Sequence, residues 1–209
     1  GIRFFRRMPG GFSVTTMEFY FDFTSPNAYC GYVQARCLQE DYEFSLKLKP
    51  VFLAGIMKEL ETTPPAMQNE AKANYLYQDI ERWTNYYDIP FNFPPEFPMD
   101  TLRALRGFLV LEDREKSVLH EYTSQVFEAA WVDEESIDED SILRECIPTS
   151  VQPGPFFEGI EEPEVKEDLK KRTDEALERG VFGCPMIYLE DEPFWGKDRF
   201  QIIEDRLNR

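Results

Sequence analysis

Bulky hydrophobic residues alternate with smaller or polar ones near the start of the chain. Phe19, Phe21 and Phe23 occupy every second position, which predicts a β-strand with at least one buried face. The alternation stops at Ser25 and Pro26; proline is favoured at the first position of a helix, and serine is a good capping residue before it. We therefore expect a strand that ends close to Ser25, followed at once by a helix that runs to about residue 39.

A second alternating pattern follows this helix. Phe44, Leu46, Leu48 and Phe52 fall on one face, with polar residues opposite, so a second strand is expected from residue 44 to residue 52. A strand, a helix and a strand at this spacing predict a βαβ unit with parallel strands. Ser25 would then lie at the carboxyl end of a strand and the amino end of a helix, where α/β proteins bind ligands and where an anion is favoured.

The pattern between residues 55 and 180 is helical. Residues at spacings of three and four predict helices over 66–87, 100–112, 117–131, 139–145 and 163–179, and a proline-rich run interrupts the chain after the first of them. The residues that recur in that first helix are expected to be core residues; they are Tyr75, Leu76, Ile80, Trp83 and Tyr87.

Strand patterns return only near the carboxyl terminus. Residues 185–190 and 193–195 predict two short strands joined by a turn, and residues 198–207 predict a closing helix. The predicted order is therefore βαβ, a helical insertion, then ββα. This is the element order of the thioredoxin fold, so the expected fold class is α/β, a thioredoxin fold with a large all-helical insertion.

This order also divides the chain. Residues 17–54 and 181–209 are expected to form the thioredoxin-like domain, and residues 55–180 the helical insertion domain. Residues 1–16 carry arginines but no acid in a strongly acidic chain, and we interpret them as a separate tail or tag.

Composition and charge exclude several classes of function. The formal net charge of -17 argues against a nucleic-acid-binding surface, because phosphate contacts need clustered lysine and arginine. No apolar run is long enough to span a bilayer, so we expect no membrane partner and a cytoplasmic location. The four cysteines include no C-x-x-C pair and no histidine at metal-ligand spacing, so neither a metal site nor a structural disulfide is expected.

Two interpretations of Ser25 remain open on the local pattern. The hydroxyl is either an ordinary helix cap or a group that faces a ligand and donates a hydrogen bond to a thiolate. The single histidine, His120, lies in a helical pattern and is interpreted as structural, because a catalytic imidazole would need an orienting partner.

Five segments carry a resemblance to a known family. They are FYFDFTSPNAY, LKPVFLAGIMK, AKANYLYQDIERW, RGVFGCPMI and FWGKDRFQIIEDRL. Together and in this order they resemble the 2-hydroxychromene-2-carboxylate isomerase and kappa-class glutathione transferase family, which belongs to the thioredoxin superfamily with the DsbA-like proteins. The resemblance covers nearly the whole chain from Met17.

This resemblance implies a role for Ser25. Disulfide oxidoreductases of the superfamily have C-P-x-C where this chain has Ser25-Pro26-Asn27-Ala28, and a hydroxyl cannot form the mixed disulfide that dithiol exchange requires. The family instead implies that Ser25 hydrogen-bonds the sulfur of bound glutathione and stabilises its thiolate at the helix N-terminus.

The same resemblance implies the residues that would bind glutathione. Cys184-Pro185 matches the family's residue before a cis-proline, whose backbone groups pair with the centre of the tripeptide. Asp198 matches the acid that receives the α-amino group of the γ-glutamyl end, with an N-cap of the last helix as its alternative, and Lys197 beside it is included among the binding residues. Lys72 matches, with a shift of one residue, a lysine that meets a carboxylate.

One departure concerns the loop before Pro64. The family usually has an asparagine there, whereas this chain offers Thr62, which can keep one hydrogen bond of an amide but not the reach of both its donor and acceptor. Thr62 is therefore the expected neighbour of the reacting centre.

Three hypotheses of function follow. The first is a glutathione-dependent enzyme, either an isomerase of aromatic-compound degradation or a transferase that conjugates glutathione to electrophiles. The second is a non-catalytic glutathione- or peptide-binding module, suggested by the missing asparagine. The third is redox chemistry at Cys30 or Cys184. Glutathione and a small-molecule substrate are the expected partners, and relatives that are dimers imply a homodimer.

Overall fold

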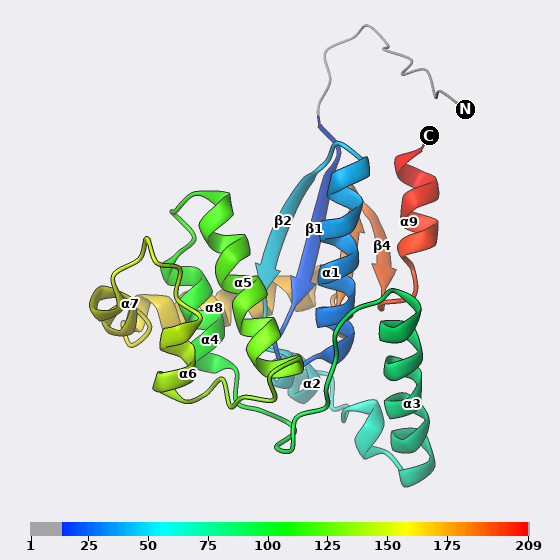
Figure 1. Ribbon diagram of the computed structural model, residues 1–209, viewed down its shortest axis with the longest axis horizontal. Helices are drawn as coiled ribbons and strands as arrows, with labels where there is room; N and C mark the ends of the chain where they lie inside the picture. Colours follow the sequence, from blue (N-terminus) through cyan, green and yellow to red (C-terminus); the bar gives the residue numbers. More distant parts are fainter. Residues whose placement is uncertain (1–13, 209) are drawn as a thin grey trace, which may run out of the picture.

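A four-stranded sheet is the centre of the molecule (Figure 1). The computed structural model describes residues 14–208. The strands are β1 (Thr16–Phe21), β2 (Ser45–Pro50), β3 (Met186–Leu189) and β4 (Glu192–Trp195), in the spatial order β2-β1-β3-β4. Strand β1 is parallel to β2 and antiparallel to β3, which is antiparallel to β4. The predicted order βαβ followed by ββα is confirmed.

The first strand begins earlier than its hydrophobic pattern predicts. Thr16 already pairs with Ser45 in the parallel ladder, and its backbone N–H donates to the carboxylate of Glu190. The predicted tail of residues 1–16 therefore overlaps β1 by one residue, because strand pairing extends beyond the alternating phenylalanines. Val14 and Thr15 precede the strand, and residues 1–13 of that prediction lie outside the described residues.

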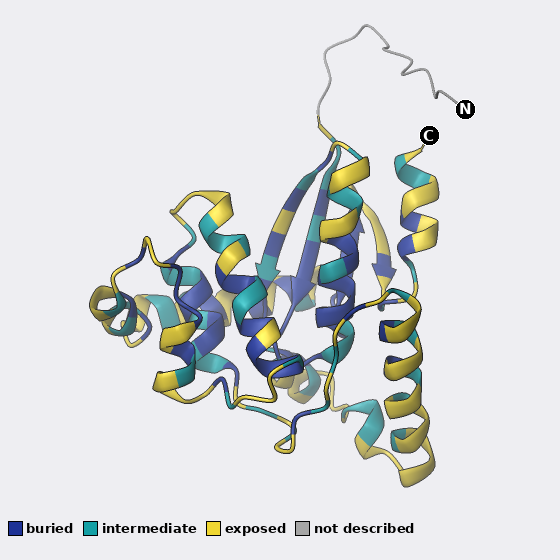
Figure 2. Ribbon diagram, in the orientation of Figure 1, coloured by how far each residue is buried: buried dark blue, intermediate teal, exposed yellow. Residues whose placement is uncertain are grey.

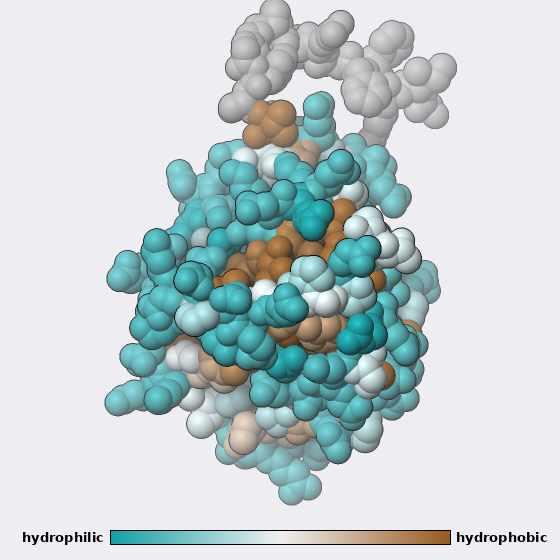
Figure 3. Space-filling view, turned by 90° about the vertical axis from the view of Figure 1, so that its left-hand side faces the viewer, coloured by the Kyte–Doolittle hydropathy of each residue, from teal (hydrophilic) through white to brown (hydrophobic). Residues whose placement is uncertain are grey.

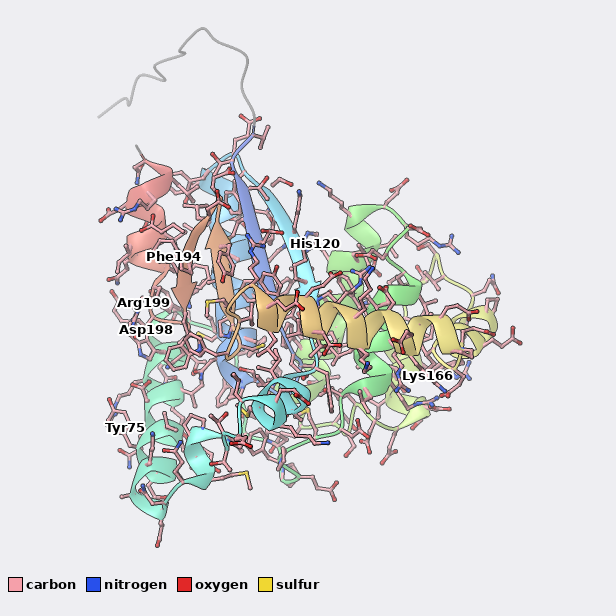
Figure 4. The ribbon with its side chains drawn as sticks, turned by 180° about the vertical axis from the view of Figure 1, so that it is seen from behind. Tyr75, His120, Lys166, Phe194, Asp198 and Arg199 are labelled. Carbon is pink, nitrogen blue, oxygen red and sulfur yellow. The ribbon has the colours of Figure 1, made fainter. Side chains whose placement is uncertain are left out.

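Helices cover both faces of the sheet. They are α1 (Pro26–Asp41), α2 (Leu53–Glu59), the 3-10 helix η1 (Pro65–Met67), α3 (Glu70–Tyr86), α4 (Leu102–Val110), α5 (Lys116–Trp131), α6 (Asp140–Glu145), α7 (Pro153–Gly159), α8 (Pro163–Glu178) and α9 (Phe200–Leu207). Helix α1 lies in front of the strands in Figure 1, and α8 crosses in front of them in the reverse view of Figure 4. The helical segment between β2 and β3 includes residues 55–180, which were predicted to be the insertion, and begins slightly earlier, with α2 at Leu53.

Two short helices were not predicted from the sequence. Helix α2 contains Gly55, and α7 reads PGPFFEG, with two glycines and two prolines in seven residues. Such residues have low helix propensity, so the local pattern gives no helical signal. Each helix buries apolar side chains instead, Ile56 in α2 and Phe156 in α7, so packing outweighs propensity.

Helix α3 projects from the rest of the molecule and is largely exposed (Figure 2). It begins at Glu70, after the cap Asn69, rather than at residue 66. The prediction that its aromatic residues belong to the core is wrong for Tyr75, which is 59% exposed, whereas Ile80 is buried as expected. The pattern identified the helix correctly, but only a narrow stripe of it has a packing partner.

Aromatic side chains of the insertion pack tightly against one another and belong to the same buried core as the sheet. Tyr122 of α5 and Phe156 of α7 are fully buried and in ring contact, and the Tyr122 hydroxyl donates to the carbonyl of Ala104 in α4. Gly107 of α4 lies directly against both rings. The absence of a side chain at Gly107 is what allows α4, α5 and α7 to approach this closely.

The surface is mainly hydrophilic, in keeping with the high net charge. Seen from the side that carries α4–α8, an elongated area of hydrophobic surface lies in a hollow framed by hydrophilic residues (Figure 3). Within residues 14–208, no helix combines the length and the apolarity that a membrane crossing needs.

One carboxyl group lies inside the core. Asp22 follows β1 and has no solvent exposure. Its carboxylate accepts hydrogen bonds from the backbone N–H groups of Thr24 (3.1 Å) and Leu53 (2.8 Å) and from the hydroxyl of Thr101 (2.7 Å). Loss of hydration on burial raises the pKa of Asp22 from 3.8 to about 6, although these three hydrogen bonds act to lower it.

The packing at Gly107 predicts a large difference between two glycine substitutions. In Gly107→Ala the new Cβ would lie 2.5 Å from the Phe156 ring and clash with the Tyr122 hydroxyl, so we expect unfolding free energy to fall by about 2–3 kcal/mol. In Gly154→Ala, in α7, the new Cβ meets no described atom within 4 Å, so this substitution should raise the unfolding free energy by about 0.5 kcal/mol. Urea unfolding of both variants checks this; equal effects would contradict the packing described.

Burial of Asp22 predicts a defined pH dependence of stability. Because its pKa is higher in the folded chain than in the unfolded one, the stability it contributes is fully present below pH 3.8 and is lost as pH rises through about 6. Asp22→Asn lacks this titration. Between pH 4.5 and 7.5 the unfolding free energy of the wild type should therefore fall by about 2 kcal/mol relative to the variant. A constant difference across this range in urea titrations would show that the pKa is not raised.

Candidate active site

Ser25 caps α1 in the turn that follows β1. Its backbone is extended, and its hydroxyl oxygen accepts the backbone N–H of Ala28 at 3.1 Å. Pro26 occupies the first helical position, as predicted. The cap interpretation of Ser25 is therefore correct, but it uses only the acceptor capacity of the hydroxyl.

The hydroxyl proton of Ser25 is directed across the sheet to a distant segment. Oγ of Ser25 donates to the carbonyl oxygen of Cys184 at 2.9 Å, a contact between residues 159 positions apart. The peptide bond between Cys184 and Pro185 is cis, as the resemblance implies. The structure thus brings together three of the predicted site residues, because β1 and β3 are antiparallel neighbours and the end of one lies beside the start of the other.

The Ser25 side of the site is only partly open. Ser25 retains 6% of its surface, while Thr24, Pro26 and Asn27 around it are half-buried. The Thr24 hydroxyl oxygen is buried and has no hydrogen-bond partner among the described residues. A small ligand would therefore meet the edge of the α1 N-terminus, beside a polar group that still lacks a partner.

Lys197 is buried and paired with the helical insertion. Its ammonium lies 2.7 Å from the carboxylate of Asp79 in α3 and 5.9 Å from the centre of the Trp83 ring. Its backbone carbonyl accepts a hydrogen bond from the side-chain amide of Gln34 in α1. Lys197 thus links α3 and α1 to the loop after β4. A ligand carboxylate would have to compete with the Asp79 carboxylate for the Lys197 ammonium.

Asp198 is exposed at the rim of the same loop. Figure 4 shows Asp198 and Arg199 between α9 and α3, with Tyr75 further along α3. The carboxylate of Asp198 pairs with the Arg199 guanidinium at 2.6 Å. The alternative interpretation, an N-cap of the last helix, is wrong: α9 begins at Phe200, so the cap position belongs to Arg199, which makes no side-chain cap bond.

The same loop is joined to the cis-proline segment through its backbone. The N–H of Gly196 donates to the carbonyl of Pro185 at 3.1 Å. Gly196 has a φ of 102°, a backbone conformation that favours glycine. This bond connects the Ser25 and Cys184 pair to the loop that carries Asp198.

The remaining two predicted residues are surface side chains. Lys72 lies in the first turn of α3, exposed, with its ammonium on the side-chain oxygen of Gln68 at 2.8 Å. Thr62 is exposed in the loop after α2, where its backbone N–H donates to the carbonyl of Met57. Within the described part of the chain no hydrogen bond joins either residue to Ser25, and their role in a site stays a prediction.

The cysteines do not provide a reactive thiolate near Ser25. Cys30 and Cys184 are buried, and burial raises the pKa of the Cys30 thiol to about 11 and that of Cys184 well above its usual range. Cys37 is the exposed cysteine among those described. The hypothesis of redox chemistry at Cys30 or Cys184 needs an accessible, low-pKa thiol, and the structure opposes it.

His120 contacts Tyr32 of α1, and its interpretation as a structural residue stays a prediction. Its backbone carbonyl accepts the hydroxyl of Tyr32, and burial lowers the pKa of its ring to about 4. Figure 4 shows it on the opposite side of the sheet region from Asp198. Within residues 14–208 no cluster of three histidine, cysteine or acidic side chains could hold a metal ion.

Sequence reasoning missed three residues that support the site, namely Asp22, Gln34 and Asp79. Asp22 had a usable signal, because a carboxylate between Phe21 and Phe23 at the end of a buried strand is rarely solvated. Gln34 and Asp79 had none, since their partners at Lys197 are 163 and 118 positions away.

Comparison with known proteins identifies the family of the chain. The DSBA-like thioredoxin domain family matches residues 16–208. The chain is 29% identical over 204 residues to a 2-hydroxychromene-2-carboxylate isomerase of Pseudomonas sp. (strain C18), covering 93% of this chain and 91% of the relative. It is 27% identical over 206 residues to glutathione S-transferase kappa 1 of Caenorhabditis elegans, covering 92% and 91%.

A solved structure supports the same conclusion. A selenomethionine form of 2-hydroxychromene-2-carboxylate isomerase superposes with a TM-score of 0.82 at 27% identity, covering 93% of this chain and 95% of that one. The chain therefore belongs to the DSBA-like thioredoxin domain family, and the proteins to which it is similar include 2-hydroxychromene-2-carboxylate isomerases and a kappa-class glutathione transferase, as the resemblance in its sequence predicted.

Proposed function

We propose that this protein is a glutathione-dependent isomerase of the 2-hydroxychromene-2-carboxylate isomerase type, in which Ser25 stabilises the thiolate of bound glutathione. One observation carries the proposal. The Ser25 hydroxyl, at the N-terminus of α1, is in hydrogen-bond contact with the residue before cis-Pro185. The similarity to an isomerase over 93% of the chain supports the reaction type.

The residues present fit a peptide-like thiol. The start of α1 carries the positive end of a helix dipole, which favours a thiolate, and the buried Thr24 hydroxyl beside Ser25 has no partner in the part of the chain that the structure describes. The carbonyl of Cys184 would accept a backbone N–H of the tripeptide. Asp198, exposed at the rim, would receive its α-amino group. When bound, glutathione supplies the nucleophilic sulfur that the chain lacks at position 25.

When glutathione binds, the hydroxyl proton of Ser25 would change its acceptor from the Cys184 carbonyl to the glutathione sulfur. Its single proton is now held by the Cys184 carbonyl, and its oxygen receives Ala28 N–H. If a ligand N–H takes over the Cys184 carbonyl, the Ser25 proton is free to turn toward a sulfur at the helix end. The Ala28 bond holds the oxygen in place during this rotation, so the hydroxyl needs to move only its proton.

A transferase that conjugates glutathione to electrophiles is the second candidate. The kappa-class relative, 27% identical over 206 residues, favours it, because the same thiolate would serve both reactions. The two are separated by turnover of a hydroxychromene carboxylate against that of a general electrophile such as chlorodinitrobenzene. If the protein binds glutathione but converts neither substrate, the hypothesis of a non-catalytic binding module, suggested by Thr62 in place of the family's asparagine, gains support.

Removal of the Ser25 hydroxyl should raise the pKa of bound glutathione. A hydrogen bond to a charged group is worth about 1.5–3 kcal/mol, so in Ser25→Ala the thiol pKa, measured by thiolate absorbance, should rise by roughly one to two units. Ser141→Ala, a surface serine in α6, is the matched control and should leave it unchanged. Absence of glutathione binding at millimolar concentration in the wild type would refute the proposal, and an unchanged thiol pKa in Ser25→Ala would remove Ser25 from it.

Asp198 and Arg199 should affect glutathione binding in opposite directions. Asp198→Asn keeps an acceptor oxygen but removes the negative charge that attracts the α-amino group, and because the site is partly exposed we expect the dissociation constant to rise by about fivefold to tenfold. Arg199→Gln removes the cation that now pairs with Asp198, so we expect the dissociation constant of glutathione to fall by about twofold. Calorimetry at low salt measures both; weakening by the two variants alike would show that Asp198 does not contact the ligand.

A further inference from the structure

The N-termini of three helices lie close to Asp22. Ser25, three residues further along the chain, caps α1; Leu53 is the first residue of α2; and Thr101 occupies the cap position of α4. The carboxylate of Asp22 accepts from Leu53 N–H and from the Thr101 hydroxyl, and from Thr24 N–H in the turn before α1. A negative charge is favoured at helix N-termini, and here one carboxylate serves several of them.

Asp22 also touches both halves of the candidate site through its backbone. Its carbonyl accepts the N–H of Ser25 at 3.1 Å, and the buried thiol of Cys184 lies against its N–H. The Ser25 hydroxyl in turn donates to the Cys184 carbonyl. Asp22, a fully buried residue, therefore contacts both the turn that carries Ser25 and the segment that carries the cis-proline.

We propose that Asp22 is a positioning residue of this site, whose carboxylate fixes the Thr24 and Ser25 turn against the Cys184 segment and against the start of α4. The catalytic meaning of this role rests on the proposed glutathione chemistry, whereas the positioning itself does not. Asp22 has no solvent exposure, so it acts through Ser25 and not on the substrate.

Only a carboxylate satisfies all of its neighbours. Three donors converge on two oxygens: Thr24 N–H and the Thr101 hydroxyl on Oδ1, and Leu53 N–H on Oδ2. An asparagine has one acceptor oxygen, so its amide group would face Leu53 N–H in one orientation and Thr24 N–H in the other. Either way a buried backbone N–H is left unpaired, and the turn or the start of α2 must shift.

The alternative, that Asp22 acts only by its charge, makes the opposite prediction. The ionisable groups that face it are Asp100, beside Thr101 before α4, and the Cys184 thiol before β3. A carboxylate near a thiolate disfavours that thiolate, so loss of the charge alone would lower the pKa of bound glutathione. Misplacement of the Ser25 hydroxyl would instead raise the pKa of bound glutathione, because the thiolate would lose a hydrogen bond.

The first experiment measures this pKa in Asp22→Asn. We expect the thiol pKa of bound glutathione to rise by about one unit, as for partial loss of the Ser25 hydrogen bond. A fall would show that Asp22 is an electrostatic neighbour, and no change would show that it is structural only. Thr123→Val removes a buried hydroxyl that bonds only within α5 and should leave the value unchanged.

The second experiment needs no glutathione. Alkylation by iodoacetamide under native conditions, followed site by site by mass spectrometry, reports on the segment before Pro185 through Cys184, with buried Cys146 as internal reference. In Asp22→Asn the ratio of Cys184 to Cys146 labelling should rise about tenfold, because a lost buried hydrogen bond increases local opening. An unchanged ratio in a folded Asp22→Asn protein overturns the proposal, whether or not the wild type binds glutathione.

A second variant keeps the proposal testable if Asp22→Asn fails to fold. Thr101→Val removes one of the three donors and leaves the carboxylate and both backbone bonds. Its Cys184 labelling ratio should rise about threefold, and the double variant should label no faster than Asp22→Asn, since Thr101 acts through Asp22. Labelling of Thr101→Val at the wild-type ratio, or full additivity in the double variant, overturns the proposal.

Discussion

The antiparallel pairing of β1 with β3 is the interaction on which the candidate site depends. Tyr20 pairs with Met186 in this ladder, so the chain that leaves β1 runs directly beside the chain that enters β3. That register places the Ser25 hydroxyl on the Cys184 carbonyl at 2.9 Å. A slip of one residue would turn the side chains of the strand to the opposite face and separate these two groups.

Buried polar groups surround this junction and tie the helical insertion to the sheet. Asp22 reaches α2 and the start of α4, and Lys197 reaches Asp79 in α3. Burying a charge is unfavourable unless hydrogen bonds or an opposite charge compensate it, and the compensating groups here include Leu53 N–H, the Thr101 hydroxyl and the Asp79 carboxylate from the segment between β2 and β3. The insertion is thereby held in register with the residues around Ser25, which a purely apolar contact would fix less specifically.

Under the proposed function, a serine at the start of α1 suits a thiol that the ligand supplies. Cys30 and Cys184, the cysteines closest in sequence to the site segments, are buried with raised pKa values, and Cys37 lies exposed near the far end of α1. The helix N-terminus that stabilises a cysteine thiolate in disulfide oxidoreductases is retained, while the thiol itself is absent from position 25. Under the proposed function, glutathione provides that sulfur and the chain provides its electrostatic environment.

The sequence by itself determined the elements that carry the site. Alternating phenylalanines predicted β1, Ser25-Pro26 predicted the start of α1, and the resemblance around Cys184-Pro185 implied the cis-proline, because these features depend on backbone preferences within a few residues. Tertiary structure alone decided that the Ser25 proton faces Cys184, that Lys197 is paired with Asp79, and that Tyr75 is exposed. Each of these depends on which distant segment lies alongside, and such pairing across more than one hundred residues leaves no trace in a local pattern of hydrophobic and polar positions.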